Sequence, residues 1–337
     1  MAETNRQVQL RTRPDGIPQP HHFKVVDTPL GALADGQFRI RNVYLSVDPA
    51  MRGWVSAVAN YSKPVGLGEV MRSFAVGEVV ESRNPDYALG ERLVGMFGWQ
   101  RFADSDGRDV IRRVREDDLP LSVQLGVLGL NGITALLGLT LIGEPKPGET
   151  VLVSTAAGAV GATVGQVAKI LGCRAVGITG RPEKVRLCLE EFGYDAALDY
   201  KAPGDLSAAV ADACPQGVHV YFDNTAGPVS DAVLPRLAEG ARVVICGTAS
   251  VASWDPPPLG PRVERHILVK RARMQGFVYF DHVGRAEEAI ARLANWVRGG
   301  MLRYREDILD GLDAAPDAIA GLYRGENLGK RLIRVGQ

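Results

Sequence analysis

A short glycine-containing turn, residues 155–161, has the spacing of a phosphate-binding site. The strand-like run VLVS precedes it and a helical pattern follows it. In a dinucleotide-binding turn, Gly158 would let the backbone approach the pyrophosphate, and Gly161 would let the helix pack closely. Backbone N–H groups at the helix N-terminus would bind the phosphates. The sequence therefore predicts a dinucleotide site at Gly158, Ala159, Val160 and Gly161, with Ala156 in place of the usual first glycine.

The residues that choose between NAD and NADP follow about twenty positions later. There the sequence reads TGRPEK, so no carboxylate stands at the end of the second predicted strand to bond a ribose 2′-hydroxyl. Arg181 and Lys184 are instead placed to bind a 2′-phosphate. Glu183 falls in the first turn of the next helix, where a negative charge is favourable. We predict NADP(H) as the cofactor, with a solvated helix lysine as the alternative for Lys184.

Short apolar strands alternate with longer helical patterns from residue 148 onward. This alternation is typical of βαβ units in a doubly wound parallel sheet. We predict strands at 150–154, 175–179, 196–199, 219–223, 242–246 and 274–279, and helices at 160–171, 183–192, 204–213, 229–237 and 283–299. Between residues 25 and 93 the strand-like pieces, such as 37–45 and 77–80, indicate a mostly β domain. The strand-like segment 329–335 is expected to rejoin that domain, because a strand cannot stand alone.

Composition excludes several classes of protein. The 337 residues suit two domains, and Lys+Arg 39 against Asp+Glu 39 leaves no basic excess for nucleic acid. The 4 cysteines and 5 histidines lack metal-ligand spacing. Glycines interrupt the uncharged stretch 119–143, so we expect a buried helix and turn there and no membrane span. The polar N-terminus lacks a signal-like segment, and we expect a cytoplasmic protein.

Several motifs together resemble one enzyme family. They are AAGAVGATVGQVAKILGC, VGITGRPEK, YFDNTAG and ENLGK, with LSVDPAMRG and VMRSFAVGEVVES upstream. In this order they resemble the zinc-independent medium-chain dehydrogenase/reductases. Among these, the sequence is similar to the leukotriene B4 12-hydroxydehydrogenase/prostaglandin reductase group and its bacterial curcumin-reductase-like members. The likeness extends from about Leu10 to Val335.

The resemblance implies a fold, a cofactor and a set of contacts. Residues 126–306 would form a Rossmann domain, and residues 1–125 with 307–337 a GroES-like, mostly β catalytic domain. NADPH would place its 2′-phosphate at Lys184 and its adenosine beside Tyr200. The same resemblance assigns turn contacts to Asn224, Cys246, Gly247 and Thr248, and contacts near the nicotinamide to Phe277, Val278 and Asn327. It also implies a homodimer.

Two active-site tyrosines of many relatives are absent from this sequence. Ala50 stands where many relatives read DPYMR, and Ala252 stands where many have a tyrosine after the CG turn. Tyr61 lies in a loop whose relatives contribute an active-site tyrosine, which makes it the catalytic candidate; a surface-loop aromatic is the alternative. Arg52, Trp254 and Tyr279 are the candidates to line the substrate pocket.

The expected activity is NADPH-dependent reduction of the carbon–carbon double bond of α,β-unsaturated ketones or aldehydes. The protein would position the substrate and stabilise the developing oxyanion, while the cofactor supplies the reducing chemistry. Quinone reduction is the alternative within enzymes, because it needs the same cofactor and a flat apolar pocket. A catalytically silent NADPH-binding protein is the alternative of another class, and the absence of both tyrosines favours it.

The cofactor prediction can be tested at Lys184. We expect Lys184→Ala to weaken NADPH binding by about 1–3 kcal/mol, the range for a hydrogen bond to a charged group. NADH binding should change little, because NADH has no 2′-phosphate. Titration by cofactor fluorescence measures both affinities, and equal losses for the two cofactors would reject the assignment.

Overall fold

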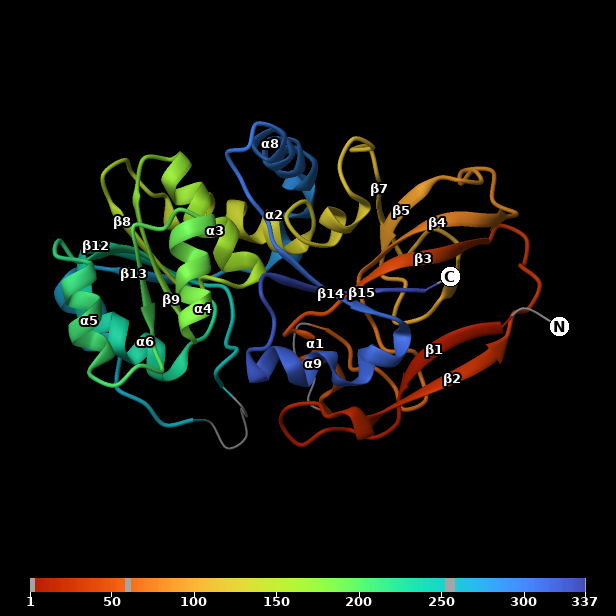
Figure 1. Cartoon of the computed structure of the whole chain (residues 1–337), viewed down its shortest axis with the longest axis horizontal. Coiled ribbons are helices and arrows are strands. Elements are labelled where there is room, and N and C mark those ends of the chain that lie inside the picture. The colour runs from red at the N-terminus through yellow and green to blue at the C-terminus, as the bar shows by residue number, and fades with distance from the viewer. Residues whose placement is uncertain (1–3, 58–61, 252–257, 337) are drawn as a thin grey trace. The chain divides into compact units, whose positions relative to one another are not determined.

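The computed structural model describes residues 4–57, 62–251 and 258–336, and its chain forms two compact units. Unit 1 consists of Met1–Gly126 together with Glu306–Gln337, and unit 2 consists of Val127–Arg305. Both ends of the chain therefore contribute to unit 1, as the two ends of the colour range in Figure 1 show. Each unit has its own sheet and its own buried core.

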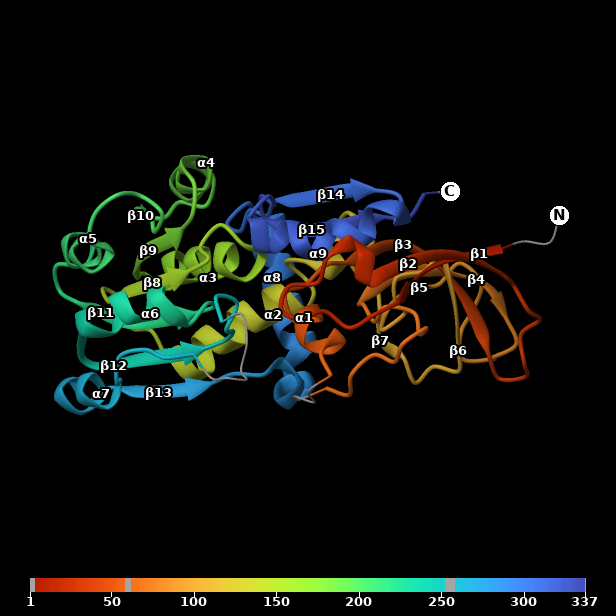
Figure 2. The ribbon, with the colours of Figure 1, turned by 90° about the horizontal axis from the view of Figure 1, so that it is seen from below.

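Unit 2 is built on a parallel sheet with the strand order β10-β9-β8-β11-β12-β13, which Figure 2 shows from one edge to the other. The strands are β8 (Thr150–Ser154), β9 (Arg174–Thr179), β10 (Ala196–Asp199), β11 (Val218–Asp223), β12 (Leu237–Ile245) and β13 (Arg273–Gly276). Its helices are α2 (Leu130–Leu137), α3 (Ala159–Ile170), α4 (Pro182–Arg186), α5 (Leu206–Ala213), α6 (Gly227–Val233), α7 (Glu264–Lys270) and α8 (Ala286–Arg298). The described part of the unit also contains the 3-10 and π-helical segments η3 (Gly138–Gly143), η4 (Leu187–Glu191), η5 (Leu234–Arg236) and η6 (Tyr279–Arg285).

Alternate residues of each strand cover the two faces of this sheet. Leu152, Val176 and Tyr221 are fully buried in a core shared with residues of α5 and α6. The opposite face is covered by α3 on β8 and β9, and by η3 on β11 and β12. Because both faces are covered, the residues of the central strand β8 are all buried, as is typical of a parallel sheet, whereas the edge strand β13 is exposed. The predicted doubly wound α/β fold is confirmed.

Several boundaries of unit 2 differ from the sequence prediction by more than one residue. Strand β12 begins at Leu237, five positions before the predicted start, because Gly240 takes φ +70° and lets the chain continue past an irregularity in its pairing with β11. Strand β13 ends at Gly276, and the segment predicted to extend it turns into η6. The predicted helix 183–192 divides into α4 and the π-helical turn η4.

Tyr194 connects the first turn of α3 to the rest of unit 2. Its buried hydroxyl donates to the carbonyl oxygen of Gly161 in the first turn of α3, at 2.7 Å. The ring lies where a Cβ on Gly165 would be only 2.0 Å from Tyr194 Cζ. A Cβ on Gly177 of β9 would lie 3.2 Å from the same ring. Glycine at these two positions therefore lets the aromatic ring fill the space between α3 and β9.

Unit 1 contains a larger sheet and a separate antiparallel pair, β1 with β2, which Figure 1 shows in red. The sheet has the order β14-β15-β3-β4-β5-β7, and β6 also pairs with β3. The strands are β1 (Thr4–Leu10), β2 (Phe23–Pro29), β3 (Phe38–Ser46), β4 (Ala75–Ser82), β5 (Arg92–Gly95), β6 (Phe102–Ser105), β7 (Val110–Arg113), β14 (Glu306–Asp310) and β15 (Lys330–Arg334). The helices are α1 (Met51–Val55) and α9 (Ala315–Arg324), with short turns η1 (Pro20–His22), η2 (Leu121–Leu125) and η7 (Leu312–Ala314).

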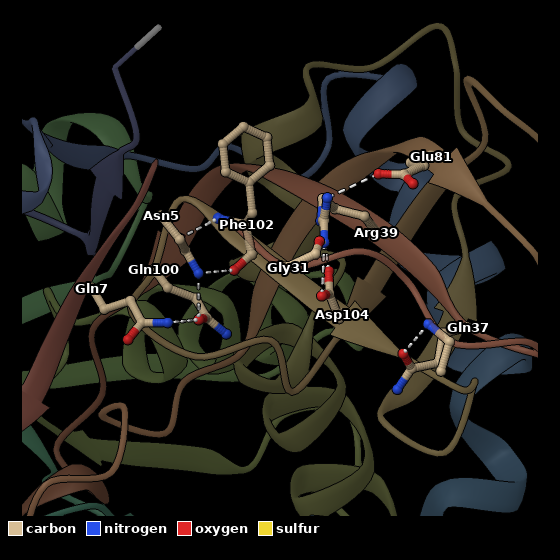
Figure 3. A network of polar contacts seen from close by, with 10 residues as sticks. Asn5, Gln7, Gly31, Gln37, Arg39, Glu81, Gln100, Phe102 and Asp104 are labelled. Atoms are coloured by element: carbon tan, nitrogen blue, oxygen red, sulfur yellow. Dashed lines mark hydrogen bonds and ion pairs between the residues drawn. The ribbon is translucent and has the colours of Figure 1, made fainter. Parts of the chain in front are cut away.

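Strand β3 organises unit 1, because one of its edges is shared by two strands. The first half of that edge pairs with β6, and the last residues, Tyr44–Ser46, pair with β15. The C-terminal strand thus rejoins the first part of the chain, as predicted from the sequence. A buried arginine, Arg39, bonds both Asp104 of β6 and Glu81 of β4, at 2.7 and 2.8 Å (Figure 3). Beside it, Asn5 of β1 bonds the backbone of Phe102.

The uncharged stretch 119–143 folds into η2, α2 and η3. Most of its side chains are buried within the two units, as the sequence analysis expects. In the part of the chain that the structure describes, each helix is too short or too polar to cross a bilayer.

The packing of Tyr194 gives a stability prediction. We expect Gly165→Ala to lower the free energy of unfolding by about 1–3 kcal/mol, the usual cost of overpacking a filled site. Helix propensity alone would make Gly165→Ala stabilising, because alanine is the better helix former. A loss of stability therefore indicates overpacking against Tyr194. Gly284→Ala is the matched control, because a Cβ there would meet nothing within 4 Å. Urea denaturation measures both variants, and a stabilised Gly165→Ala would contradict the described packing.

Candidate active site

The turn between β8 and α3 forms a backbone cradle. Gly158 caps α3 in an extended conformation, and the first turn of α3 contains no acidic side chain. A Cβ on Gly161 would lie 2.3 Å from the carbonyl oxygen of Thr155, so only glycine permits this close contact. The turn therefore presents N–H groups and the positive end of a helix dipole without a carboxylate of its own. These features fit the pyrophosphate of a dinucleotide.

The topological switch of the sheet lies beside this turn, between β8 and β11. Asp223, at the end of β11, is buried and accepts hydrogen bonds from Ser154 Oγ at 3.1 Å and from Thr225 N and Ala226 N, each at 2.9 Å. Asn224 Nδ2 donates to the carbonyl oxygen of Ser154 at 2.7 Å. In open α/β sheets, ligands bind at such a switch point, outside the carboxyl ends of the strands. The network fixes Asn224, one of the predicted cofactor residues, at that point.

The end of β12 joins the same network through its backbone. Cys246 N and Gly247 N both donate to the carbonyl oxygen of Asp223, at 2.8 and 3.1 Å. A Cβ on Gly247 would lie 3.0 Å from the carbonyl oxygen of Asn224. Burial and the nearby Asp223 carboxylate raise the pKa of the Cys246 thiol to about 12, so this cysteine is a neutral packing residue at physiological pH. Thr248 follows directly, so the predicted residues Cys246, Gly247 and Thr248 line one turn.

Cationic side chains gather at the end of β9. Arg181 adopts φ +85° and begins α4, which carries Lys184 on its first turn. The ring of Tyr200 packs against Gly180, and a Cβ on Gly180 would lie 2.8 Å from this ring. Tyr200 N donates to the carbonyl oxygen of Thr179. Glu183 is 3.7 Å from Arg181. The structure thus brings Arg181, Lys184 and Tyr200 to the tip of one strand.

Lys201 is a further cation at this tip, and the sequence analysis missed it. Its ammonium group lies 5.6 Å from the centre of the Tyr200 ring, and its Cε would be 3.2 Å from a Cβ on Gly180. Asp199 accepts from the backbone N–H of Lys201 at 2.9 Å, which fixes its backbone next to β9. The signal in the sequence was its position directly after the predicted adenosine-side residue.

The remaining predicted residues are distributed over both units. In unit 2, Phe277 is buried, donates its N–H to the carbonyl oxygen of Ile245, and stacks on His282 with ring centres 4.9 Å apart. Val278 precedes η6, in which Tyr279 is buried. In unit 1, Arg52 lies over the Tyr323 ring, and Asn327 Nδ2 donates to the carbonyl oxygen of Gly329. Tyr61 and Trp254 lie outside the described residues.

A metal site was not expected from the sequence. Among the residues that the structure describes, no group of three or more His, Cys, Asp or Glu side chains is arranged to hold a metal ion. The independence from zinc stays a prediction.

Comparison with known proteins identifies the family. Residues 6–112 match the family described as the N-terminal domain of oxidoreductase, and residues 159–295 match the family described as zinc-binding dehydrogenase. The NADPH-dependent curcumin reductase of Escherichia coli (strain K12) is 43% identical over 340 residues, which cover 99% of this chain and 97% of that protein. The NADP(+)-dependent 2-alkenal reductase of Nicotiana tabacum is 34% identical over 343 residues, and 100% of each chain is covered. CurA from Vibrio vulnificus, crystallised in complex with NADPH, aligns with a TM-score of 0.91 and 39% identity over 98% of this chain and 99% of that chain.

The strand order and the β8–α3 turn define a Rossmann dinucleotide-binding unit. The chain belongs to the medium-chain dehydrogenase/reductase family, in its curcumin-reductase-like branch. The family resemblance seen in the sequence and the prediction of NADP(H) are both confirmed. The protein is an NADP-dependent oxidoreductase, since its full-length relatives are enzymes of that kind.

Proposed function

We propose that this enzyme reduces the carbon–carbon double bond of α,β-unsaturated ketones or aldehydes with NADPH. The observation that carries the proposal is its full-length similarity to a curcumin reductase and to a 2-alkenal reductase. The carboxyl edge of the unit 2 sheet supports it, because the predicted cofactor residues gather there. When bound, NADPH supplies the hydride.

We assign distinct parts of the cofactor to distinct strand ends of unit 2. The β8–α3 turn would bind the pyrophosphate through backbone N–H groups at Ala159, Val160 and Gly161. The cationic tip of β9 would bind the 2′-phosphate through Lys184, Arg181 and Lys201. The ends of β11 and β12 would contact the middle of the cofactor through Asn224 and the 246–248 turn. Phe277 and Val278, at the end of β13, would then position the nicotinamide.

The oxyanion needs its own donor. Hydride addition to an enone places negative charge on the carbonyl oxygen, and donors aimed at that atom are among the largest contributions to catalysis. Ala50 and Ala252 have no group to donate. We assign the role to Tyr61, shared with the hydroxyl of the nicotinamide ribose. Arg52, Trp254 and Tyr279 are proposed to shape the substrate pocket.

A turnover assay tests the proposal. The wild-type enzyme and Tyr61→Phe are each supplied with NADPH and a panel of 2-alkenals and enones, and separately with a panel of quinones. We expect wild-type turnover of enones. Tyr61→Phe should reduce the rate by about 10-fold, the lower part of the range for one transition-state donor, with NADPH affinity unchanged.

The other outcomes of this assay are equally informative. Turnover of quinones without any enone would favour quinone reduction, and tight NADPH binding without turnover of either panel would favour a silent binding protein. A Tyr61→Phe variant at the wild-type rate, when hydride transfer limits turnover, would remove Tyr61 from the mechanism. The homodimer, the cytoplasmic location and the domain boundaries stay predictions from the sequence.

A further inference from the structure

Lys330, the first residue of β15, has an ammonium group whose hydrogen bonds are all made inside unit 1. Its Nζ donates to Ser46 Oγ at 2.7 Å, to the carbonyl oxygen of Val47 at 2.9 Å and to Asp48 Oδ1 at 2.7 Å. The hydroxyl of Ser46 donates in turn to the other carboxylate oxygen of Asp48. An ammonium group has three donors, so each of them has a partner here.

The pair is deeply buried. The side chains of Lys330 and Asp48 are each only 5% exposed. Burial lowers the pKa of Lys330, and the carboxylate of Asp48 opposes that change. Apolar side chains of the same volume often stabilise a fold as well as a buried ion pair does. Stability alone therefore does not explain these two residues, whereas a fixed geometry would.

The position of the pair is set by the register of β15 on β3. Leu332 pairs with Ser46 in this antiparallel ladder, so Lys330 stands opposite Asp48, just beyond its end. Asp48 is where β3 gives way to α1, and its carbonyl oxygen accepts from Met51 N at 3.0 Å. The ion pair thus joins the turn between β3 and α1 to the start of β15. These two segments are 282 residues apart in the sequence.

Next to each of these two segments lies a residue that we assign to the active site. Arg52 follows Asp48 on α1, and its guanidinium lies 5.0 Å from the centre of the Tyr323 ring. The hydroxyl of Tyr323 donates to the carbonyl oxygen of Pro49 at 3.1 Å. On the other side, Asn327 Nδ2 donates to the carbonyl oxygen of Gly329, the residue directly before Lys330, at 2.8 Å. A displacement of the ion pair would therefore also displace the side chains of Arg52 and Asn327.

We propose that Lys330 and Asp48 are positioning residues for the reduction, because their buried ion pair holds the turns that place Asn327 and Arg52. The proposal rests on the proposed function and on the contact near the nicotinamide that the family resemblance implies for Asn327. Lys330 and Asp48 are proposed to have no direct contact with the cofactor. They act through the two segments that they join.

Arg39 supplies a matched control in the same unit. It is also a buried cation, with its side chain 8% exposed, and it bonds Asp104 of β6 on the same edge of β3. Arg39 stands near the start of β3, whereas Asp48 lies just past its end. Lys330→Met and Arg39→Met each remove one buried cation, so both variants should lose stability. Only Lys330→Met should disturb the cofactor site.

The test compares two ligands of the full-length enzyme, NADPH and 2′,5′-ADP, which lacks the nicotinamide. We expect Lys330→Met to weaken NADPH binding about 3- to 10-fold, the effect of one misplaced neutral hydrogen bond, and to leave 2′,5′-ADP binding unchanged. Arg39→Met should change neither affinity. The proposal is overturned if Lys330→Met binds NADPH like the wild type, if both ligands weaken equally, or if Arg39→Met has the same effect.

The double variant Asp48→Asn/Lys330→Met covers the case in which Lys330→Met fails to fold, because it removes both charges of the ion pair and does not leave the Asp48 carboxylate buried without its partner. The same ligand comparison then applies. Enone turnover by the wild type is measured separately. Its absence would reject the proposed function, whereas the ligand comparison still decides whether the ion pair positions the nicotinamide side.

Discussion

The hydrogen bonds to the buried carboxylate of Asp223 are the interaction on which the carboxyl edge of the unit 2 sheet depends. It accepts hydrogen bonds from Ser154 at the end of β8 and from the backbone of the turn that follows β11. Its own carbonyl oxygen accepts from Cys246 and Gly247 at the end of β12. The ends of β8, β11 and β12 are thereby joined by hydrogen bonds to one residue. Because these hydrogen bonds satisfy the buried carboxylate, the edge of the sheet can contain a buried charged group.

The two units use buried polar groups for different purposes. In unit 2 the Asp223 network and the Tyr194 hydroxyl fix backbone turns that follow the parallel strands. In unit 1 two buried cations, Arg39 and Lys330, anchor the strands that share one edge of β3. Small residues complete the arrangement in unit 2, since Gly161, Gly165 and Gly247 have no room for a Cβ without displacing a neighbour.

The sequence predicted the elements of unit 2 well because its signals are local. A strand, a glycine turn and a helix follow one another at β8 and α3, and each predicted cofactor residue of unit 2 stands at or near a strand end. The contacts that join these ends are not local. Ser154 meets Asp223 across 69 residues, and Lys330 meets Asp48 across 282, so neither pairing could be read before the strand order was known. Lys201 was missed for a related reason, because its relation to Gly180 depends on the parallel pairing of β10 with β9.

Transfer of the hydride from NADPH to the β-carbon of the enone can be followed with deuterium. The wild-type enzyme is supplied with an enone and with NADPH deuterated at C4 of the nicotinamide, on each face in turn, and the product is analysed by NMR. We expect a saturated ketone or aldehyde that carries deuterium at the β-carbon, from one face of the cofactor only. Deuterium on a carbinol carbon, or recovery of the unchanged enone while NADPH remains bound, would contradict it.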